Sequence, residues 1–326
     1  MKKFAAIVLS LMMATASLVG CTPAGASDGD QSSGGQNYVT IATGGSSGAY
    51  YALGGTVANL LNENVENMNA SVQSTGASAV NSTLISQGKA ELAFAMNDVV
   101  NYAYTGTETF ADKEAMDSIR GVAALYPNFV QLITLENTGV NEVSDLSGKR
   151  VGVGAPGSGT EVNARQILQA HGLTYDDVEE DFLSYSEAVE QLKNGAVDAA
   201  FLTSGIPNSA IMDLATTKDV KIVPIRKEAV EGLAEDFPFY TSEMIPAGTY
   251  DNTEDVETAA VTTLLVTSAD LSEEMVYEMT KTIFENLDAL GQTHSSGKKI
   301  SLDNVRVGMP IPLHPGAEKY FAEQGK

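Results

Sequence analysis

Two stretches of the sequence repeat one order: a short apolar strand, a glycine-rich turn and the start of a helix. In the first, the strand is residues 38–42 and the turn is residues 43–51. In the second, the strand is residues 150–153 and the turn is residues 154–160. Glycine lets the backbone approach a ligand closely, and the dipole of the following helix favours negative charge at that point. Each turn therefore predicts an anion-binding corner.

A second pair of anchors supports a duplication. Residues 45–47 correspond to 157–159 at an interval of 112 residues, and residues 88–94 correspond to 195–201 at an interval of 107 residues. Strands and helices alternate around both pairs, which is typical of a parallel sheet covered by helices. The sequence therefore predicts two similar α/β lobes, each with its glycine corner at the carboxyl edge of its sheet, where open sheets bind ligands.

Two continuous apolar runs, residues 129–135 and 259–267, have the length and composition of buried strands. We expect the first run to carry the chain from one lobe to the other and the second to carry it back. The first lobe would then be discontinuous, with residues 38–128 and 260–326, and residues 129–259 would form the second lobe with the hinge crossings.

The first twenty residues have the pattern of a signal peptide: a basic start at Lys2 and Lys3, an apolar run and small residues. Residues 18–21, Leu-Val-Gly-Cys, resemble the lipobox of bacterial lipoproteins, in which the cysteine is lipidated. We therefore expect lipidation at Cys21 and a flexible linker at 21–37, because that segment is rich in Ser, Gly, Ala, Asp and Gln. The protein would then be extracytoplasmic and lipid-anchored to a bacterial membrane.

Charge and cysteine content exclude several classes of partner and site. The chain has 42 acidic against 19 basic residues, a formal net charge of −23 at pH 7, which argues against nucleic acid and anionic membrane surfaces as partners. An anionic ligand would have to be held by local dipoles. Cys21 is the only cysteine, so the chain cannot form an internal disulfide or a thiolate site for zinc or iron–sulfur clusters.

Several motifs together resemble the TAXI family of solute-binding receptors, which serve tripartite ATP-independent periplasmic (TRAP) transporters. The similarity runs from about Tyr38 to the end of the chain. Asn97 departs from the residues that the family often carries there, so the resemblance leaves the identity of the ligand open. The motifs are residues 43–51, 95–98, 125–127, 148–165 and 311–320.

This resemblance implies a type II periplasmic-binding-protein fold, in which two α/β lobes joined by crossing hinge strands close on a ligand. It implies a small carboxylate as the ligand, either a glutamate-like amino acid or a dicarboxylate, and TRAP-type permease subunits as the membrane partner. The expected protein is a monomeric transport receptor and not an enzyme, and it needs no cofactor or metal.

We expect the ligand between the two corners, where backbone N–H groups and hydroxyls can donate hydrogen bonds to it. The tyrosines of the set could instead be core residues, Asp98 could cap the next helix rather than accept from an amino group, and the nearby Arg165 could form an internal salt bridge rather than contact the ligand. The candidate ligand-binding residues are Gly45, Ser46, Ser47, Tyr50, Tyr51, Asn97, Asp98, Tyr126, Ser158, Gly159 and Thr160.

The main alternative is a secreted serine hydrolase, because Gly44-x-Ser46-x-Gly48 matches the nucleophile-elbow pattern between a strand and a helix. It would require Ser46 to act with an acid and with His171, His294 or His314. Only one strand precedes the motif, which leaves no loop to supply an oxyanion hole.

Two nucleotide-binding motifs match the sequence less well than the solute-receptor motifs do. Gly152-x-Gly154-x-x-Gly157 matches the dinucleotide fingerprint, and Asp176 or Asp177 follows about twenty residues later. However, the second strand is expected to end at Tyr185, where that site needs an acid. A phosphate-binding loop is excluded because Thr160 stands where its lysine belongs. A surface interaction protein with a vestigial cleft is a third possibility.

Overall fold

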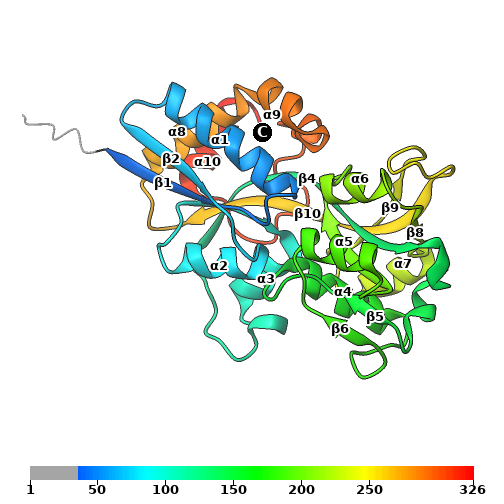
Figure 1. Ribbon diagram of the computed structural model, residues 1–326. Helices are drawn as coiled ribbons and strands as arrows, with labels where there is room; N and C mark the ends of the chain where they lie inside the picture. Colours follow the sequence, from blue (N-terminus) through cyan, green and yellow to red (C-terminus); the bar gives the residue numbers. More distant parts are fainter. Residues whose placement is uncertain (1–35) are drawn as a thin grey trace, which may run out of the picture. The chain divides into compact units, whose positions relative to one another are not determined.

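The computed structural model describes residues 36–326 (Figure 1). The predicted signal peptide, Cys21 and nearly all of the predicted linker lie outside the described residues. Asn37, the last residue assigned to that linker, instead begins the first strand. No helix in the described part is both long and apolar enough to cross a membrane.

All strands of the described part join one ten-stranded sheet. Its main path runs in the order β2-β1-β3-β10-β4-β7-β5-β6, while β8 pairs with β4 and β9 pairs with β10. In chain order the strands are β1 (Asn37–Ala42), β2 (Met68–Gln73), β3 (Leu92–Met96), β4 (Ile119–Leu135), β5 (Arg150–Gly152), β6 (Glu179–Asp181), β7 (Ala199–Ser204), β8 (Val220–Val223), β9 (Thr241–Ile245) and β10 (Val256–Ser268).

The two halves of the sheet have the same strand order. In lobe 1, β2, β1 and β3 are parallel and β10 runs antiparallel beside β3. In lobe 2, β6, β5 and β7 are parallel and β4 runs antiparallel beside β7. In each half the spatial order is therefore the second, the first and the third strand of that half, followed by a long antiparallel strand. The sequence anchors predict two similar lobes, and the order of the strands comes from the structure.

The two long strands β4 and β10 pair with each other and with strands of both halves. β4 contacts β10 up to Phe129 and β7 from Phe129 onward, while β10 contacts β9 first and β3 last. The crossing strands are thus present, but β4 starts ten residues before the expected residue 129. The added segment contains Gly121 and Pro127, which obscure a strand in the sequence.

Helices cover both faces of the sheet (Figure 1). In lobe 1, α1 packs with α8 and α9, and α2 packs with α3; in lobe 2, α4 packs with α7, and α5 packs with α6. The helices are α1 (Ala49–Asn64), α2 (Ser78–Ser86), α3 (Asn97–Thr105), α4 (Gly159–Ala170), α5 (Tyr185–Asn194), α6 (Ser209–Ala215), α7 (Lys227–Asp236), α8 (Glu273–Phe284), α9 (Leu287–Thr293) and α10 (Pro315–Glu323), with 3-10 turns at Glu108–Phe110, Glu136–Thr138, Val143–Leu146 and Ser295–Lys299.

Two expected boundaries are wrong. The apolar positions from Met275 to Leu290 predict one helix, but α8 ends at Phe284 and α9 begins at Leu287, because Asn286 lies between them in a non-helical conformation. The strand expected at 181–185 is β6, which ends at Asp181. Ser184 then caps α5 with a reciprocal capping box, which draws Tyr185 into the helix.

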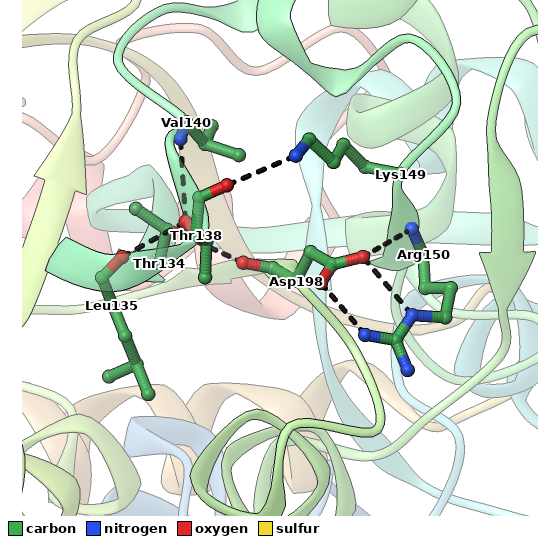
Figure 2. A network of polar contacts seen from close by, with 7 residues as sticks. All are labelled: Thr134, Leu135, Thr138, Val140, Lys149, Arg150 and Asp198. Carbon is green, nitrogen blue, oxygen red and sulfur yellow. Dashed lines mark hydrogen bonds and ion pairs between the residues drawn. The ribbon is translucent and has the colours of Figure 1, made fainter.

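A polar cluster fixes the amino ends of β5 and β7 (Figure 2). Arg150, the first residue of β5, donates two side-chain hydrogen bonds to Asp198, just before β7, and the side chains of the pair are 42% and 23% exposed. The hydroxyl of Thr134 in β4 donates to the carbonyl of Asp198 at 2.7 Å, and Lys149 donates to the carbonyl of Thr138. The cluster therefore ties the carboxyl end of β4 to the amino ends of β5 and β7.

Two adjacent glycines of α1 allow a test of how closely this helix packs on the sheet. A Cβ on Gly54 would lie 2.6 Å from Cγ2 of Thr43, which its own hydrogen bond to the carbonyl of Gln73 holds in place. A Cβ on Gly55 would meet nothing within 4 Å. We predict that Gly54→Ala lowers the free energy of unfolding by about 1–2 kcal/mol despite the better helix propensity of alanine.

Gly55→Ala is the matched control and should raise the free energy of unfolding by about 0.5–1 kcal/mol, since it removes only backbone freedom. Urea denaturation of both variants measures the difference. Equal effects of the two substitutions would contradict close packing at Gly54.

Candidate functional site

A cavity lies between the glycine corners of the two lobes. It has about 60 Å³ of space open to the centres of water molecules, which is room for a few waters or the head of a small organic molecule. Residues of both lobes line it: Gly44, Gly45, Gly48, Ala49, Tyr50, Thr75, Gly76, Ala77 and Met96 from lobe 1, and Ala155, Ser158, Ser184, Tyr185, Thr203 and Ser204 from lobe 2.

Four helices begin at this cavity. Their N-cap residues are Gly48 for α1, Ala77 for α2, Ser158 for α4 and Ser184 for α5, and all four line the cavity. Each helix N-terminus carries about half a positive elementary charge and has backbone N–H groups without an intrahelical acceptor. Four such ends around one small space favour an anion there, and Glu161 and Glu187 in the first turns of α4 and α5 offset part of their charge.

No lysine, arginine, aspartate or glutamate is among the described residues that line the cavity. Arg150 is held by Asp198 at the opposite edge of the lobe 2 sheet, and Arg165 pairs with Glu161 and Glu108 at 3.5 Å. The internal salt bridge is thus the role that the structure gives Arg165. Among the groups that line the cavity, positive partial charge therefore comes from backbone dipoles.

Buried side-chain bonds hold the lobe 1 corner in shape. Asn81 donates to the carbonyls of Thr43 at 2.6 Å and Phe94 at 2.7 Å, and its oxygen accepts from the hydroxyl of Thr75. These bonds join the end of β1, the middle of β3 and the first turn of α2. The N-cap Ala77 has φ +73° and ψ −142°, a conformation costly for a residue with a Cβ. The surrounding bonds maintain that strain at the wall of the cavity.

The lobe 2 corner has a similar internal network. Ser158 accepts from the backbone N–H of Glu161 at 3.1 Å, which leaves the hydroxyl proton of Ser158 free to donate. The hydroxyl of Tyr185 donates to the carbonyl of Thr203 and lies 3.1 Å from Oγ1 of Thr160. That same oxygen accepts from the N–H of Thr203 at 3.3 Å. Burial raises the pKa of Tyr185 to about 12, so its hydroxyl keeps its proton.

The lobes touch each other on both sides of the cavity, so the structure has the closed arrangement. The carbonyl of Gly157 accepts from the N–H groups of Ala79 and Val80 in the first turn of α2. On another side, the carbonyl of Ser47 accepts from the hydroxyl of Ser209 at 2.9 Å. A Cβ on Gly159 would lie 2.3 Å from the sulfur of Met96, which shows how closely α4 approaches lobe 1.

Three of the predicted site residues, Gly45, Tyr50 and Ser158, line the cavity. Tyr50 is buried, its hydroxyl accepts from Asn128 at 2.7 Å and its ring stacks on Phe94, so it is both a wall and a core residue.

Five more predicted residues lie around the cavity without lining it. Gly159 and Thr160 form the first turn of α4 just behind Ser158, and both are buried. Ser46 and Tyr51 are exposed, and Ser47 contacts lobe 2 at the rim through Ser186 and Ser209.

The other three predicted residues, Asn97, Asp98 and Tyr126, do not line the cavity. Asn97 donates to the carbonyl of Gly308 at 3.1 Å and accepts from the N–H of Thr262, so it braces β10. Tyr126 is 2% exposed within the sheet and its hydroxyl has no partner in the described part. Their place near the carboxyl ends of strands suggested a ligand role, but their side chains serve the core.

Asp98 joins the two lobes through hydrogen bonds. It is fully buried at the start of α3, where one oxygen accepts from the N–H of Val99 and the other from Asn163 of α4 at 2.8 Å. Asn163 also donates to the hydroxyl of Tyr240, which in turn donates to Gln166. Burial raises the pKa of Asp98 from 3.8 to about 6 against the lowering effect of its hydrogen bonds.

The sequence reasoning missed most of the lining residues. Thr75, Gly76 and Ala77 form a small-residue turn before α2, in the same position as the two glycine corners, and this signal was available. Ser184 follows β6 and Ser204 ends β7. Ser184 was missed because the sequence placed the end of β6 at Tyr185 instead of Asp181. The remaining missed residues are Gly44, Gly48, Ala49, Met96, Ala155, Tyr185 and Thr203.

The structure does not support the hydrolase alternative. The ring nitrogens of His171, His294 and His314 contact the backbone carbonyls of Ile167, Pro207 and Leu271, and none has a hydrogen bond to Ser46.

The nucleotide alternative likewise finds no support at this cavity. β6 ends at Asp181, so an acid does end that strand, but Asp181 is exposed and does not line the cavity. Residues 36–326 contain no group of three or more histidine or acidic side chains placed to hold a metal ion.

A family model described as the NMT1-like family matches residues 41–325. Among solved structures, PhnD1 from Prochlorococcus marinus in complex with methylphosphonate has a TM-score of 0.55 at 11% identity, over 81% of this chain and 92% of that chain. A protein from Bordetella bronchiseptica RB50 has a TM-score of 0.53 at 17% identity, over 87% of this chain and 88% of that chain.

The periplasmic aliphatic sulphonate binding protein SsuA from Escherichia coli has a TM-score of 0.49 at 15% identity, over 88% of this chain and 83% of that chain. At these identities the likeness concerns the fold alone. The predicted fold class, a two-lobed α/β fold of the periplasmic-binding-protein type, is confirmed.

The raised pKa of Asp98 predicts a pH dependence of stability. The folded pKa of about 6 lies above the unfolded value of 3.8, so the folded protein binds more protons between these values. The contribution of Asp98 to stability therefore falls by about 3 kcal/mol as pH rises from about 4 to about 6. We expect Asp98→Asn to remove this component, as measured by urea denaturation from pH 4 to pH 7. The same slope in both proteins would contradict the prediction.

Proposed function

The chain belongs to the NMT1-like family, and from this premise we propose that it is an extracytoplasmic receptor that captures a small carboxylate between two closing lobes. The observation that carries the proposal is the cavity at which four helices begin and which no charged side chain lines. Hydrogen bonds to a charged group contribute about 1.5–3 kcal/mol each, so four or five could support micromolar binding after the cost of ordering.

In this proposal, closure of the two lobes is the change by which the transporter recognises a receptor with bound ligand. Residues 38–128 and 260–326 move as one lobe and residues 129–259 as the other, with β4 and β10 as the hinge. The ligand bonds to both corners only when the lobes are closed, so it favours the closed state by its differential affinity. The bond from Ala79 to Gly157 and the bond from Asn163 to Asp98 would form in the same movement.

The resemblance to the TAXI family extends the proposal to a partner and a ligand class. A TRAP-type permease would recognise the closed receptor and take the solute, a glutamate-like amino acid or a dicarboxylate. Lipidation at Cys21 would hold a monomeric receptor at the membrane, outside the cytoplasm. Catalysis is not part of this function, and no cofactor is required.

The lipid anchor can be tested by itself. We predict that Cys21→Ala abolishes the incorporation of labelled fatty acid into the protein in expressing bacteria, because the thiol is the attachment point. Metabolic labelling followed by immunoprecipitation provides the measurement. Equal labelling of the Cys21→Ala protein would rule out this anchor without bearing on ligand binding.

A ligand screen tests the receptor function. A ligand at a concentration of 100 times its Kd raises the free energy of unfolding by about 2.7 kcal/mol, which gives a clear rise in melting temperature. The screen should include amino acids, keto acids, dicarboxylates, phosphonates and sulfonates. No shift with any anion would contradict a solute receptor, and a preference for phosphonates or sulfonates would contradict the carboxylate class.

Ser158→Ala should weaken ligand binding about tenfold, since it removes a hydroxyl that lines the cavity. The matched control is Ser272→Ala, because Ser272 caps α8 with the same type of bond, to the N–H of Met275, away from the cavity. Both variants lose a helix cap worth about 1 kcal/mol, but only Ser158→Ala should change affinity in calorimetry. Unchanged affinity of Ser158→Ala would contradict the role of the second corner.

A further inference from the structure

A buried network of polar side chains crosses between the two lobes outside the cavity. In lobe 1 it contains Asp98 and Tyr102 of α3, and in lobe 2 it contains Asn163 and Gln166 of α4 and Tyr240. Asn163 donates to Asp98 and to the hydroxyl of Tyr240, both at 2.8 Å. Tyr240 donates to Gln166 at 2.7 Å, and Gln166 donates to the hydroxyl of Tyr102 at 3.1 Å. The network therefore starts and ends on α3 and passes through lobe 2 between these points.

Asp98 is the acidic residue of this network, and both of its partners are neutral. Its oxygens accept from the backbone N–H of the next residue and from Asn163. The basic residue of α4, Arg165, pairs instead with Glu161 and with Glu108, in the 3-10 turn that follows α3, both at 3.5 Å. The contact between the lobes therefore buries the carboxyl of Asp98 without a counter-ion.

The other titratable groups around Asp98 are neutral tyrosines. Burial raises the pKa of Tyr50, Tyr102 and Tyr240, and a charge on Asp98 raises it further. α2 and β3 pack beside α3 and contain no titratable residue, and Glu257 of β10 accepts from the first N–H of α7. None of these elements therefore brings a basic side chain that would stabilise the charged form of Asp98.

The hydrogen bonds of Asn163 also favour a proton on Asp98. The side-chain oxygen of Asn163 is buried and has no partner in the described part. A half-turn of this amide would place its oxygen opposite Asp98, where a protonated carboxyl can donate to it. An ionised carboxylate at this position is a buried charge without a cation, which is strongly unfavourable. Burial accordingly raises the pKa of Asp98 to about 6.

Separation of the lobes would remove Asn163 and Tyr240 from Asp98 and admit water to the carboxyl. We propose that Asp98 and Asn163 form a latch between the lobes that takes up a proton when it closes, so that acid favours the closed receptor. This inference rests on the proposed function, in which the lobes open and close, and it does not depend on the class of ligand.

The sign of the effect follows from the two states of Asp98. The pKa of its carboxyl is about 6 in the closed state, and in water it has the ordinary value of 3.8. The closed state therefore binds the proton more tightly, and the proton stabilises this state fully below the ordinary value. This stabilisation is lost as the pH rises through about 6. The ratio of closed to open molecules should fall about tenfold from pH 5 to pH 8.

Single-molecule energy transfer between dyes on the two lobes tests the latch without a ligand. We choose the full chain with Cys21→Ser, so that dyes attach only at Lys89→Cys in lobe 1 and Lys193→Cys in lobe 2. Both lysines are exposed and lie near the carboxyl ends of α2 and α5, whose N-termini line the cavity. The distance between the dyes should therefore change when the lobes separate.

The outcomes separate the latch from lobe closure itself. Two states whose ratio shifts toward the open one as the pH rises would support the latch. A constant ratio of the two states, or an open state alone, would overturn the latch and leave lobe closure intact. A closed state alone at every pH would overturn both.

Two variants separate Asp98 from the other groups that titrate between the lobes. Asp98→Asn places a neutral group of the same shape there at every pH, so the tenfold change should be absent. Glu108→Gln is the matched control and should keep the change, because Glu108 also bonds across the lobes, to Arg165, but is partly exposed. His294 contacts lobe 2 at another place and is the same in both variants, so its titration cancels from the comparison. An unaltered pH dependence of Asp98→Asn, folded by circular dichroism, would overturn the role of Asp98.

Discussion

The antiparallel pairing of β4 with β10 is the interaction on which the rest of the structure depends. Its register runs from Ala260 opposite Phe129 to Ser268 opposite Ile119, and the parallel strands of both lobes attach to its two sides. A slip of one residue would turn every side chain of a strand to the other face and disrupt close packing on both buried faces, which favours this register. Once it is fixed, the carboxyl ends of β1 and β3 and those of β5 and β7 open toward one space. The cavity follows from backbone pairing before any side chain in it is specified.

The same topology explains why the site has no charged side chain. In a parallel sheet each strand leads into a helix at its carboxyl end, so helix N-termini gather where two such edges meet. The cavity draws four of them from α1, α2, α4 and α5. Backbone dipoles set in a folded scaffold need no reorganisation to hold an anion, whereas a lysine or arginine there would lose side-chain freedom. The basic residues near the lobes instead have structural partners, as Arg150 has Asp198 and Arg165 has Glu161.

Repetition in the sequence made the fold predictable. The site residues were harder to predict, because buried contacts with distant residues decide their roles. Two copies of a glycine corner predict two lobes, because the order of strand, turn and helix is a local property. The contacts of Asn97 and Asp98 are not local: Asn97 bonds to Gly308 and Thr262, and Asp98 to Asn163. Their position after a strand gave no indication that their side chains would form hydrogen bonds with these distant residues. Thr203 shows the reverse case, since nothing near it in the sequence marks a hydroxyl that the fold leaves without a partner.

The acidic surface and the anion-attracting cavity act over different distances. A net charge of −23 repels an approaching anion, but at physiological ionic strength this field is screened over about 8 Å. Helix N-termini act within about a turn of their ends, and they act in an enclosed space where water screens them little. An anion that reaches the cavity therefore experiences the four dipoles rather than the surface charge. In the proposed function, affinity is a property of the closed lobes, since closure would bring the second pair of helices to the ligand.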